Sequence, residues 1–184
     1  MHRKNLREKI IDIASKSFSK YGYDKTRMDD VAISADVAKG TLYLYFKSKE
    51  DLFTAISERN IEKLQNHFVE HFDNKEDLIH SIENFYNTFE HPDNKVFFEI
   101  LSESSRNKKL KTLLIKNRKK VIGIIIAYLD LQKKRGLLKK DLESDLIAYI
   151  LVNQYDGLRI NNILGIEQQK SNNIWLILIK KLFY

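Results

Sequence analysis

The sequence predicts an all-helical protein, and three observations lead to that fold class. Apolar residues recur at intervals of three and four along most of the 184 residues, which is the spacing of one face of an α-helix. The single proline and six glycines leave few positions that would break a helix. No segment shows the alternation of apolar and polar residues that is typical of strands. We expect about nine helices.

The first predicted helix covers residues 5–21. Leu6, Ile10, Ala14 and Phe18 recur every four residues, so they share one face of that helix. Gly22 follows them, and glycine is the residue that most readily takes the left-handed conformation in which helices end.

Two short helices follow, separated by a turn at residues 35–37. Thr26 is placed to cap the first of them, and Asp29 and Asp30 lie in its first turn, where the helix dipole favours negative charge. The second short helix covers residues 38–46. The apolar face of the first short helix, the one that follows Thr26, consists of Met28, Val31, Ala32 and Ala35.

The rest of the chain keeps helical spacing. Residues 48–51 resemble a capping box, with aspartate where glutamate is preferred, and they open a long helix that runs to about residue 72. Gly136 and a break near Gly165 end two of the later helices. After this long helix, five more helices are expected, at residues 75–90, 96–105, 110–134, 141–164 and 172–183.

Residues 26–52 follow the plan of a helix-turn-helix, in which two short helices flank a three-residue turn behind a longer helix. Leu42 and Phe46 are four residues apart and are expected to face the core. The second short helix begins with small or polar residues, which suit close approach to a DNA groove: Ala38, Lys39, Gly40 and Thr41.

Positive charge is concentrated near the start of the sequence. The first 50 residues hold 11 lysines and arginines against 7 acidic residues, a net charge of +4 out of +7 for the whole sequence. This excess suits a polyanionic partner, although a solvated lysine-rich surface explains it equally well. The lysines placed to neutralise phosphates are Lys39, Lys47 and Lys49, and the hydroxyls placed to reach phosphates or base edges are those of Tyr43 and Tyr45.

Together these residues resemble the TetR (tetracycline-repressor-like) family of transcriptional regulators. The motif runs Lys39-Gly40-Thr41-Leu42-Tyr43, then Tyr45-Phe46, then Lys47-Ser48-Lys49-Glu50-Asp51-Leu52, after an upstream match at Phe18, Tyr21-Gly22-Tyr23, Thr26 and Val31-Ala32. A weaker match lies within residues 136–158. The resemblance implies a DNA-binding domain at residues 1–50 and a helical ligand-binding and dimerisation domain at residues 51–184.

The resemblance also implies a function. Such regulators bind palindromic operators as homodimers and respond to a small molecule in the C-terminal domain, without catalytic activity and without a cofactor. Asp36 stands where the family commonly has glycine, and Leu44 where it often has tyrosine or histidine, so the operator sequence cannot be carried over. The residues implied to contact DNA are Thr26, Ala38, Lys39, Gly40, Thr41, Tyr43, Tyr45 and Lys49, with Thr26 and Lys49 on backbone phosphates.

The C-terminal domain offers weaker signals. Its aromatic side chains suit a core, and polar residues within an apolar helix suit a cavity with a few polar anchors. On that basis the expected effector contacts are Phe68, Phe85, Phe89, Phe98, Tyr128, Asn153, Tyr155 and Arg159. The expected dimer interface comes from the last two helices and comprises Ile147, Ile150, Leu151, Leu158, Trp175, Leu178, Ile179 and Leu182.

Two other functions remain open. His67, Glu70 and His71 match the H-x-x-E-H pattern of one class of zinc hydrolases, with both histidines on one helix face. A surface histidine pair is the simpler interpretation, because the pattern is short and lies in the helix that links the two domains of the family. The fold also suits a helical interaction module without sequence-specific DNA binding.

The location of the protein is expected to be the cytoplasm. The sequence has no cysteine, which excludes disulfides, thiol catalysis and cysteine-ligated zinc and suits a reducing compartment. It also has no apolar stretch long enough for a signal peptide or a membrane span.

Overall fold

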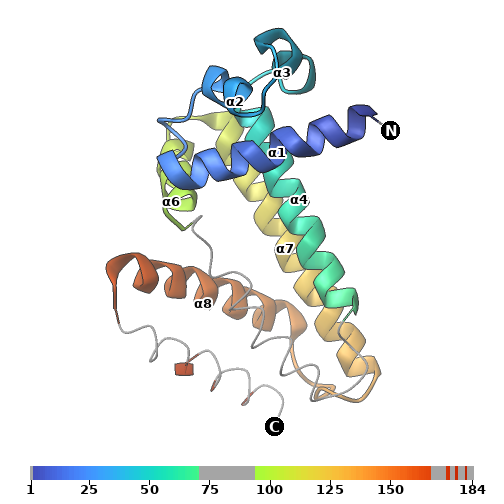
Figure 1. Cartoon of the computed structure of the whole chain (residues 1–184). Coiled ribbons are helices and arrows are strands. Elements are labelled where there is room, and N and C mark those ends of the chain that lie inside the picture. The colour runs from blue at the N-terminus through green and yellow to red at the C-terminus, as the bar shows by residue number, and fades with distance from the viewer. Residues whose placement is uncertain (1, 71–93, 167–172, 175–176, 178–180, 182–184) are drawn as a thin grey trace. The chain divides into compact units, whose positions relative to one another are not determined.

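The computed structural model describes residues 2–70, 94–166, 173–174, 177 and 181. Within these residues the chain forms seven helices and no strand (Figure 1). None of the helices in this part of the chain is long and apolar enough to cross a membrane. The helices are α1 (His2–Tyr21), α2 (Met28–Ser34), α3 (Lys39–Tyr45), α4 (Lys49–Glu70), α6 (Asn94–Ser104), α7 (Lys108–Lys134) and α8 (Ser144–Leu164).

The predicted all-helical fold class is confirmed, and most helix boundaries differ from the expected ones by a few residues. Seven helices are described against about nine expected. The helix expected at residues 75–90 and most of the one expected at 172–183 lie outside the described residues. Gly22, Gly136 and Gly165 have φ angles of 86°, 75° and 68°, as expected for residues that end helices.

The two predicted caps have different outcomes. Ser48 accepts a hydrogen bond from the backbone N–H of Asp51 at 3.2 Å just before α4, as the capping box predicts. Thr26 does not cap α2: Arg27 is the N-cap residue, without a side-chain cap bond. The reason is that the Thr26 hydroxyl turns inward and donates to the carbonyl of Gly22 at 2.7 Å.

The chain divides into two compact units that do not follow the order of the sequence. Unit 1 consists of Met1–Glu62 and Pro92–Asn117, and unit 2 of Lys63–His91 and Arg118–Tyr184. Both α4 and α7 contribute residues to each unit. The compact units describe packing, whereas the boundary that we expect between residues 50 and 51 separates DNA binding from ligand binding. That functional boundary stays a prediction.

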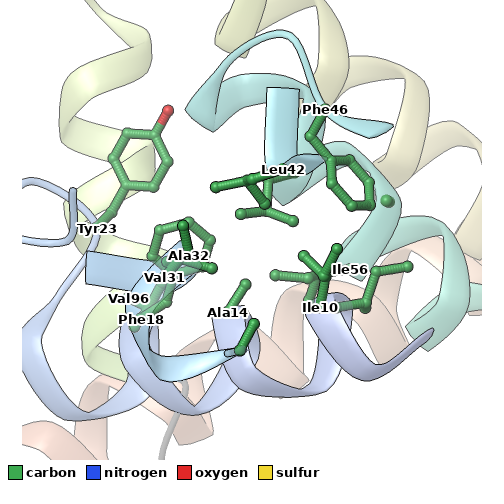
Figure 2. Close-up of a cluster of buried hydrophobic side chains, with 14 of the residues drawn as sticks. Ile10, Ala14, Phe18, Tyr23, Val31, Ala32, Leu42, Phe46, Ile56 and Val96 are labelled. Carbon is green, nitrogen blue, oxygen red and sulfur yellow. The ribbon is translucent and has the colours of Figure 1, made fainter. Parts of the chain in front are cut away.

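An apolar core holds unit 1 together. In Figure 2, Leu42 and Phe46 reach this core from α3, while Ile10, Ala14 and Phe18 reach it from α1. At seven residues each, α2 and α3 are too short to be stable alone, so this packing keeps them folded. The buried members are Ile10, Ile11, Ala14, Phe18, Tyr23, Val31, Ala32, Ala35, Leu42, Phe46, Leu52, Ala55, Ile56, Val96, Ile100 and Leu110.

Two polar pairs align the first turns of α4 and α7 within unit 1. Asn107 donates to Oε1 of Glu50 at 3.1 Å, and the Lys116 ammonium lies 3.8 Å from Oε1 of Glu58. Glu50 precedes Glu58 in the sequence, and their partners Asn107 and Lys116 follow in the same order. The N-terminal parts of α4 and α7 therefore run side by side in the same direction.

Unit 2 has a separate core, and polar contacts brace the connection between α7 and α8. Ser144 donates to Oδ1 of Asp130 at 2.6 Å, and the Lys133 ammonium donates to the carbonyl of Leu142 at 2.8 Å. The Ser144 hydroxyl and, after it, Lys133 hold the pKa of Asp130 below its usual value. The buried core residues are Leu64, Ile122, Ile125, Tyr128, Leu129, Leu138, Ala148, Leu151, Val152 and Leu158.

Candidate nucleic-acid interface

Helix α3 has one buried face and one exposed face. Leu42 is 0% exposed and Phe46 3% exposed, as the spacing predicts. On the opposite face Gly40 is exposed and Leu44 is 76% exposed. A Cβ added at Gly40 would meet nothing within 4 Å, so this face of α3 is open.

The polar residues of α3 lie around this open face. Ala38 and Lys39 are exposed, and Thr41, Tyr43 and Tyr45 are half-buried. The six predicted contacts at residues 38–45 therefore lie on one short helix and its N-cap. Their contact with DNA stays a prediction.

Lys39 forms an exposed salt bridge with Asp29 of α2. Its ammonium lies 2.8 Å from Oδ2 of Asp29, and both side chains are more than half exposed. The hydrogen bond to Asp29, together with the negative charge of Asp29, raises the pKa of Lys39. Lysine is already a cation at neutral pH, so this shift leaves the charge of Lys39 unchanged. Lys47 pairs with the backbone and not with a carboxylate, since its ammonium donates to the carbonyl of Tyr43 at 3.0 Å.

The turn between α2 and α3 contains an aspartate in left-handed geometry. Asp36 has a φ of 54°. Among the described residues, it is the one non-glycine residue in the left-handed region. Aspartate tolerates this region better than most residues. The backbone N–H of Val37 donates to the carbonyl of Ala32 at 3.0 Å, which closes the end of α2 and directs the chain into α3.

The side chains of Thr26 and Lys49 both bond to backbone carbonyls of the loop at residues 22–26. Thr26 is 3% exposed, and its hydroxyl donates to the carbonyls of Gly22 and Ser17 at 2.7 and 3.3 Å. The Lys49 ammonium donates to the carbonyls of Tyr23 and Asp24 at 2.8 and 3.2 Å. Both side chains thus support the loop in this structure, and their contact with phosphates stays a prediction.

Lys49 and Glu99 hold Tyr23, and neither contact was predicted from the sequence. The Lys49 ammonium lies 4.4 Å from the centre of the Tyr23 ring, and burial of that ring raises the pKa of its hydroxyl. Glu99 on α6 accepts a hydrogen bond from the backbone N–H of Tyr23 at 2.6 Å. A Cβ at Gly22 would come within 2.5 Å of this carboxylate, so Glu99 fits because residue 22 is glycine.

The residues predicted to contact an effector belong to both units, and their role stays a prediction. Phe98 belongs to unit 1, whereas the other described members belong to unit 2. Asn153 accepts a hydrogen bond from Arg118 at 2.7 Å, and Arg159 lies over the ring of Tyr155. Tyr128 is 6% exposed in the core of unit 2, and Phe68, Phe85 and Phe89 lie outside the described side chains.

Gln132 was not expected from the sequence. It is 0% exposed on α7, and its side-chain amide has no hydrogen-bond partner in the part of the chain that the structure describes. Tyr128 lies one turn before it and is also buried, which raises the pKa of the Tyr128 hydroxyl. A glutamine within an apolar helix gives no sequence signal that it will be buried.

The predicted dimer residues lie in three different settings. Leu151 and Leu158 are buried in the chain's own unit 2 core, and Ile147 is half-buried against it. Ile150 is 46% exposed, while Trp175, Leu178, Ile179 and Leu182 lie outside the described residues. The exposed apolar side chains of α8 that were not predicted are Leu146, Tyr149, Ile160, Ile163 and Leu164.

The zinc-hydrolase alternative is not tested by the described residues. The side chains of His67, Glu70 and His71 lie outside those described. Across the described residues there is no group of three histidine, aspartate or glutamate side chains that could hold a metal ion.

Comparison with known proteins gives a match centred on this interface. The family model of the bacterial regulatory proteins of the tetR family matches residues 10–56, which include α2, α3 and the turn between them. An uncharacterized HTH-type transcriptional regulator of Bacillus subtilis (strain 168), YhgD, is 53% identical over 47 residues. These residues make up 26% of this chain and 25% of YhgD.

A second relative extends the match slightly. IcaR of Staphylococcus epidermidis, the HTH-type negative transcriptional regulator of the biofilm operon icaADBC, is 32% identical over 81 residues. The aligned part is 44% of this chain and 42% of IcaR, so the chain matches less than half the length of either relative.

The whole chain is similar in fold to a putative TetR-family transcriptional regulator from Rhodococcus sp. The two superpose with a TM-score of 0.83 at 17% identity, over 98% of this chain and 100% of the other. At this identity the similarity concerns the fold alone. Residues 10–56 thus match the tetR family of bacterial regulatory proteins, and the fold of the whole chain is similar to that of a solved TetR-family regulator.

Proposed function

We propose that this chain is a cytoplasmic, ligand-responsive transcriptional repressor that binds a palindromic DNA operator as a homodimer. Residues 1–50 would bind DNA, and residues 51–184 would bind a small molecule and form the dimer. The observation that carries this proposal is the open face of α3, which lies within the family match at residues 10–56.

The proposed DNA contact uses α3 as the recognition helix. The major groove of B-DNA admits one α-helix, and an exposed face with glycine at its N-terminal end allows close approach. Lys39 supplies a cation at the same end, and the net charge of +4 in the first 50 residues favours a polyanion. Tyr43 and Tyr45 flank the open face and are placed to bond phosphates or base edges.

The proposed dimer uses exposed apolar residues of α8. Six large apolar side chains are at least 44% exposed along this helix, at intervals that keep most of them on one side. A surface of this kind suits contact with a second copy, and two-fold symmetry would pair two recognition helices with a palindrome. The six are Leu146, Tyr149, Ile150, Ile160, Ile163 and Leu164. Repression is proposed because IcaR, which shares the N-terminal match, is a negative regulator.

The proposed effector response rests on unit 2. The buried amide of Gln132 offers donors and an acceptor without partners in the described residues, and a small molecule with complementary groups would satisfy them. We propose that such a ligand favours a state in which the two recognition helices no longer fit successive major grooves. Its effect is limited by the difference between its affinities for the two states. A ligand that binds tightly and leaves operator affinity unchanged would contradict this response.

The first experiment is selection of random duplex DNA by the purified protein, followed by anisotropy titrations at several salt concentrations. We expect an enriched palindrome whose affinity falls steeply as salt rises. Lys39→Ala should weaken binding about tenfold or more and reduce the slope of log affinity against log salt by about one. Tyr43→Ala should weaken binding to the palindrome by a similar factor, about 1–3 kcal/mol.

Lys140→Ala is the matched control, because Lys140 is an exposed lysine of unit 2, outside the family match. It should keep the affinity and the salt slope of the unaltered protein. If no motif is enriched, and the wild type and all three variants bind equally weakly, the repressor function is wrong and the helical interaction module becomes the better account.

A further inference from the structure

The outermost position on the recognition helix is occupied by a residue that cannot form a side-chain hydrogen bond. Leu44 is 76% exposed, although leucine is usually a core residue. It lies one helical turn after Gly40, so the two residues share a face. That face is opposite Leu42, which is fully buried.

The arrangement around Leu44 separates apolar from polar chemistry. With 3.6 residues per turn, Gly40 and Leu44 occupy the middle of the exposed face, and Lys39, Tyr43 and Tyr45 occupy its two edges. The edge residues carry the donors and acceptors that suit phosphates. Gly40 has no side chain to hold the helix away from a surface, and nothing lies within 4 Å of where its Cβ would be. Leu44 is therefore the side chain that would project farthest into a groove.

Major-groove base edges offer one prominent apolar feature. Guanine, adenine and cytosine present nitrogen and oxygen donors and acceptors, whereas thymine also presents its C5-methyl group. A leucine side chain gains nothing from a donor or an acceptor, and it excludes water from a group that it covers. The base edge that best complements Leu44 is therefore a thymine methyl.

Resting on the DNA binding proposed above, we propose that Leu44 is a specificity-determining residue that recognises a thymine C5-methyl group in each half-site of the operator. The palindrome selected by the protein should then contain a thymine at one fixed position per half-site. Its preference over the other bases there should depend on the methyl group and not on base pairing.

Replacement of single thymines by deoxyuridine tests this directly, because deoxyuridine keeps the pairing and the O4 acceptor and removes only the methyl group. Each thymine pair of the selected palindrome is replaced in turn, and affinities are measured by anisotropy. For the wild type we expect one position at which the replacement weakens binding about fourfold in one half-site. Replacement in both half-sites should weaken it about fifteenfold, from the burial of one carbon group per site.

Leu44→Ala should bind the thymine operator more weakly than the wild type and should lose most of the penalty for deoxyuridine at that position. Ile33→Ala is the matched control, because Ile33 is an apolar residue of equal exposure, 77%, that lies on α2. It should keep the full penalty. Circular dichroism verifies that both variants fold, as expected for exposed positions.

Two results would overturn the role of Leu44 while leaving the repressor function intact. The first is sequence-selective binding by a wild type that tolerates deoxyuridine at every position. The second is an equal deoxyuridine penalty in the wild type and in Leu44→Ala. Absence of any sequence-selective binding would instead overturn the repressor function together with the role of Leu44.

Discussion

The cores of the two units treat buried polar groups differently. In unit 1, Thr26 and Ser104 are buried, and each donates a hydrogen bond to a backbone carbonyl. In unit 2, Ser144 donates to the side-chain carboxylate of Asp130, but the buried Gln132 leaves a carbonyl oxygen and two N–H donors without partners in the described residues. Unit 1 leaves three single atoms in this state, the Tyr23 hydroxyl, Nε of Arg59 and Oδ1 of Asn117, but no complete side-chain amide among the described residues.

Under the function proposed above, unit 1 would support the DNA-binding helices and unit 2 would receive the effector. Polar contacts in unit 1 converge on one loop, at residues 22–26, which positions the two short helices that follow. A fold gains stability from such contacts, since a satisfied buried group costs far less than an unsatisfied one. A buried amide without partners at Gln132 would cost stability in the protein alone, and natural proteins accept such costs mainly where function requires them.

The largest change in the free energy of unfolding is expected from truncating a core side chain of α3. Leu42→Ala removes a fully buried side chain and should lower the free energy of unfolding by about 2–5 kcal/mol. Leu44→Ala, two residues away on the exposed face, should change it by no more than about 0.5 kcal/mol. Urea unfolding followed by far-UV circular dichroism measures both. Equal losses in the two variants would mean that α3 does not have the two faces described.

The two faces of α3 could be predicted because local spacing determines them. Leu42 and Phe46 share a face by their separation of four residues, and the short motif around them identifies the helix. The left-handed turn at Asp36 is also a local feature, since it depends on the backbone preference of one residue. Local rules also located the ends of helices at Gly22, Gly136 and Gly165.

A smaller effect is expected from the contact that joins α6 to the loop before α2. Glu99→Ala should lower the free energy of unfolding by about 2 kcal/mol, because it removes a hydrogen bond to a charged group and leaves the N–H of Tyr23 without its acceptor. Glu99→Gln keeps an acceptor and should cost less than half as much. Hydrogen exchange at the Tyr23 amide gives a local readout, which should quicken strongly only in the alanine variant. Unchanged exchange there would show that Glu99 does not hold the loop.

The role of Glu99 could not be predicted from the sequence. It lies 76 residues from Tyr23, and no local rule relates an acidic residue in one helix to a backbone N–H so far away. The same limit affected unit 2, where Leu151 and Leu158 were expected at a dimer interface and are instead buried in the core. Helical spacing shows that these residues share an apolar face, but the three-dimensional packing decides whether that face meets the chain's own core or a second copy.

The smallest effect has the opposite sign and concerns the core of unit 2. Gln132→Met replaces a buried amide by an apolar side chain of similar length, so it should raise the free energy of unfolding by about 1 kcal/mol in the absence of any ligand. Urea unfolding measures this gain. Leu129→Met is the matched control, because Leu129 is 2% exposed in the same helix and already apolar, and it should show no gain.

If Gln132 anchors the effector, the methionine variant should be more stable and yet keep its DNA affinity while losing its response to an effector that releases the wild type. Stability and response then change in opposite directions, as expected when a buried polar group is retained for binding and not for folding. A loss of stability in Gln132→Met would show instead that the amide is satisfied in solution, and the cores of the two units would then follow the same rule.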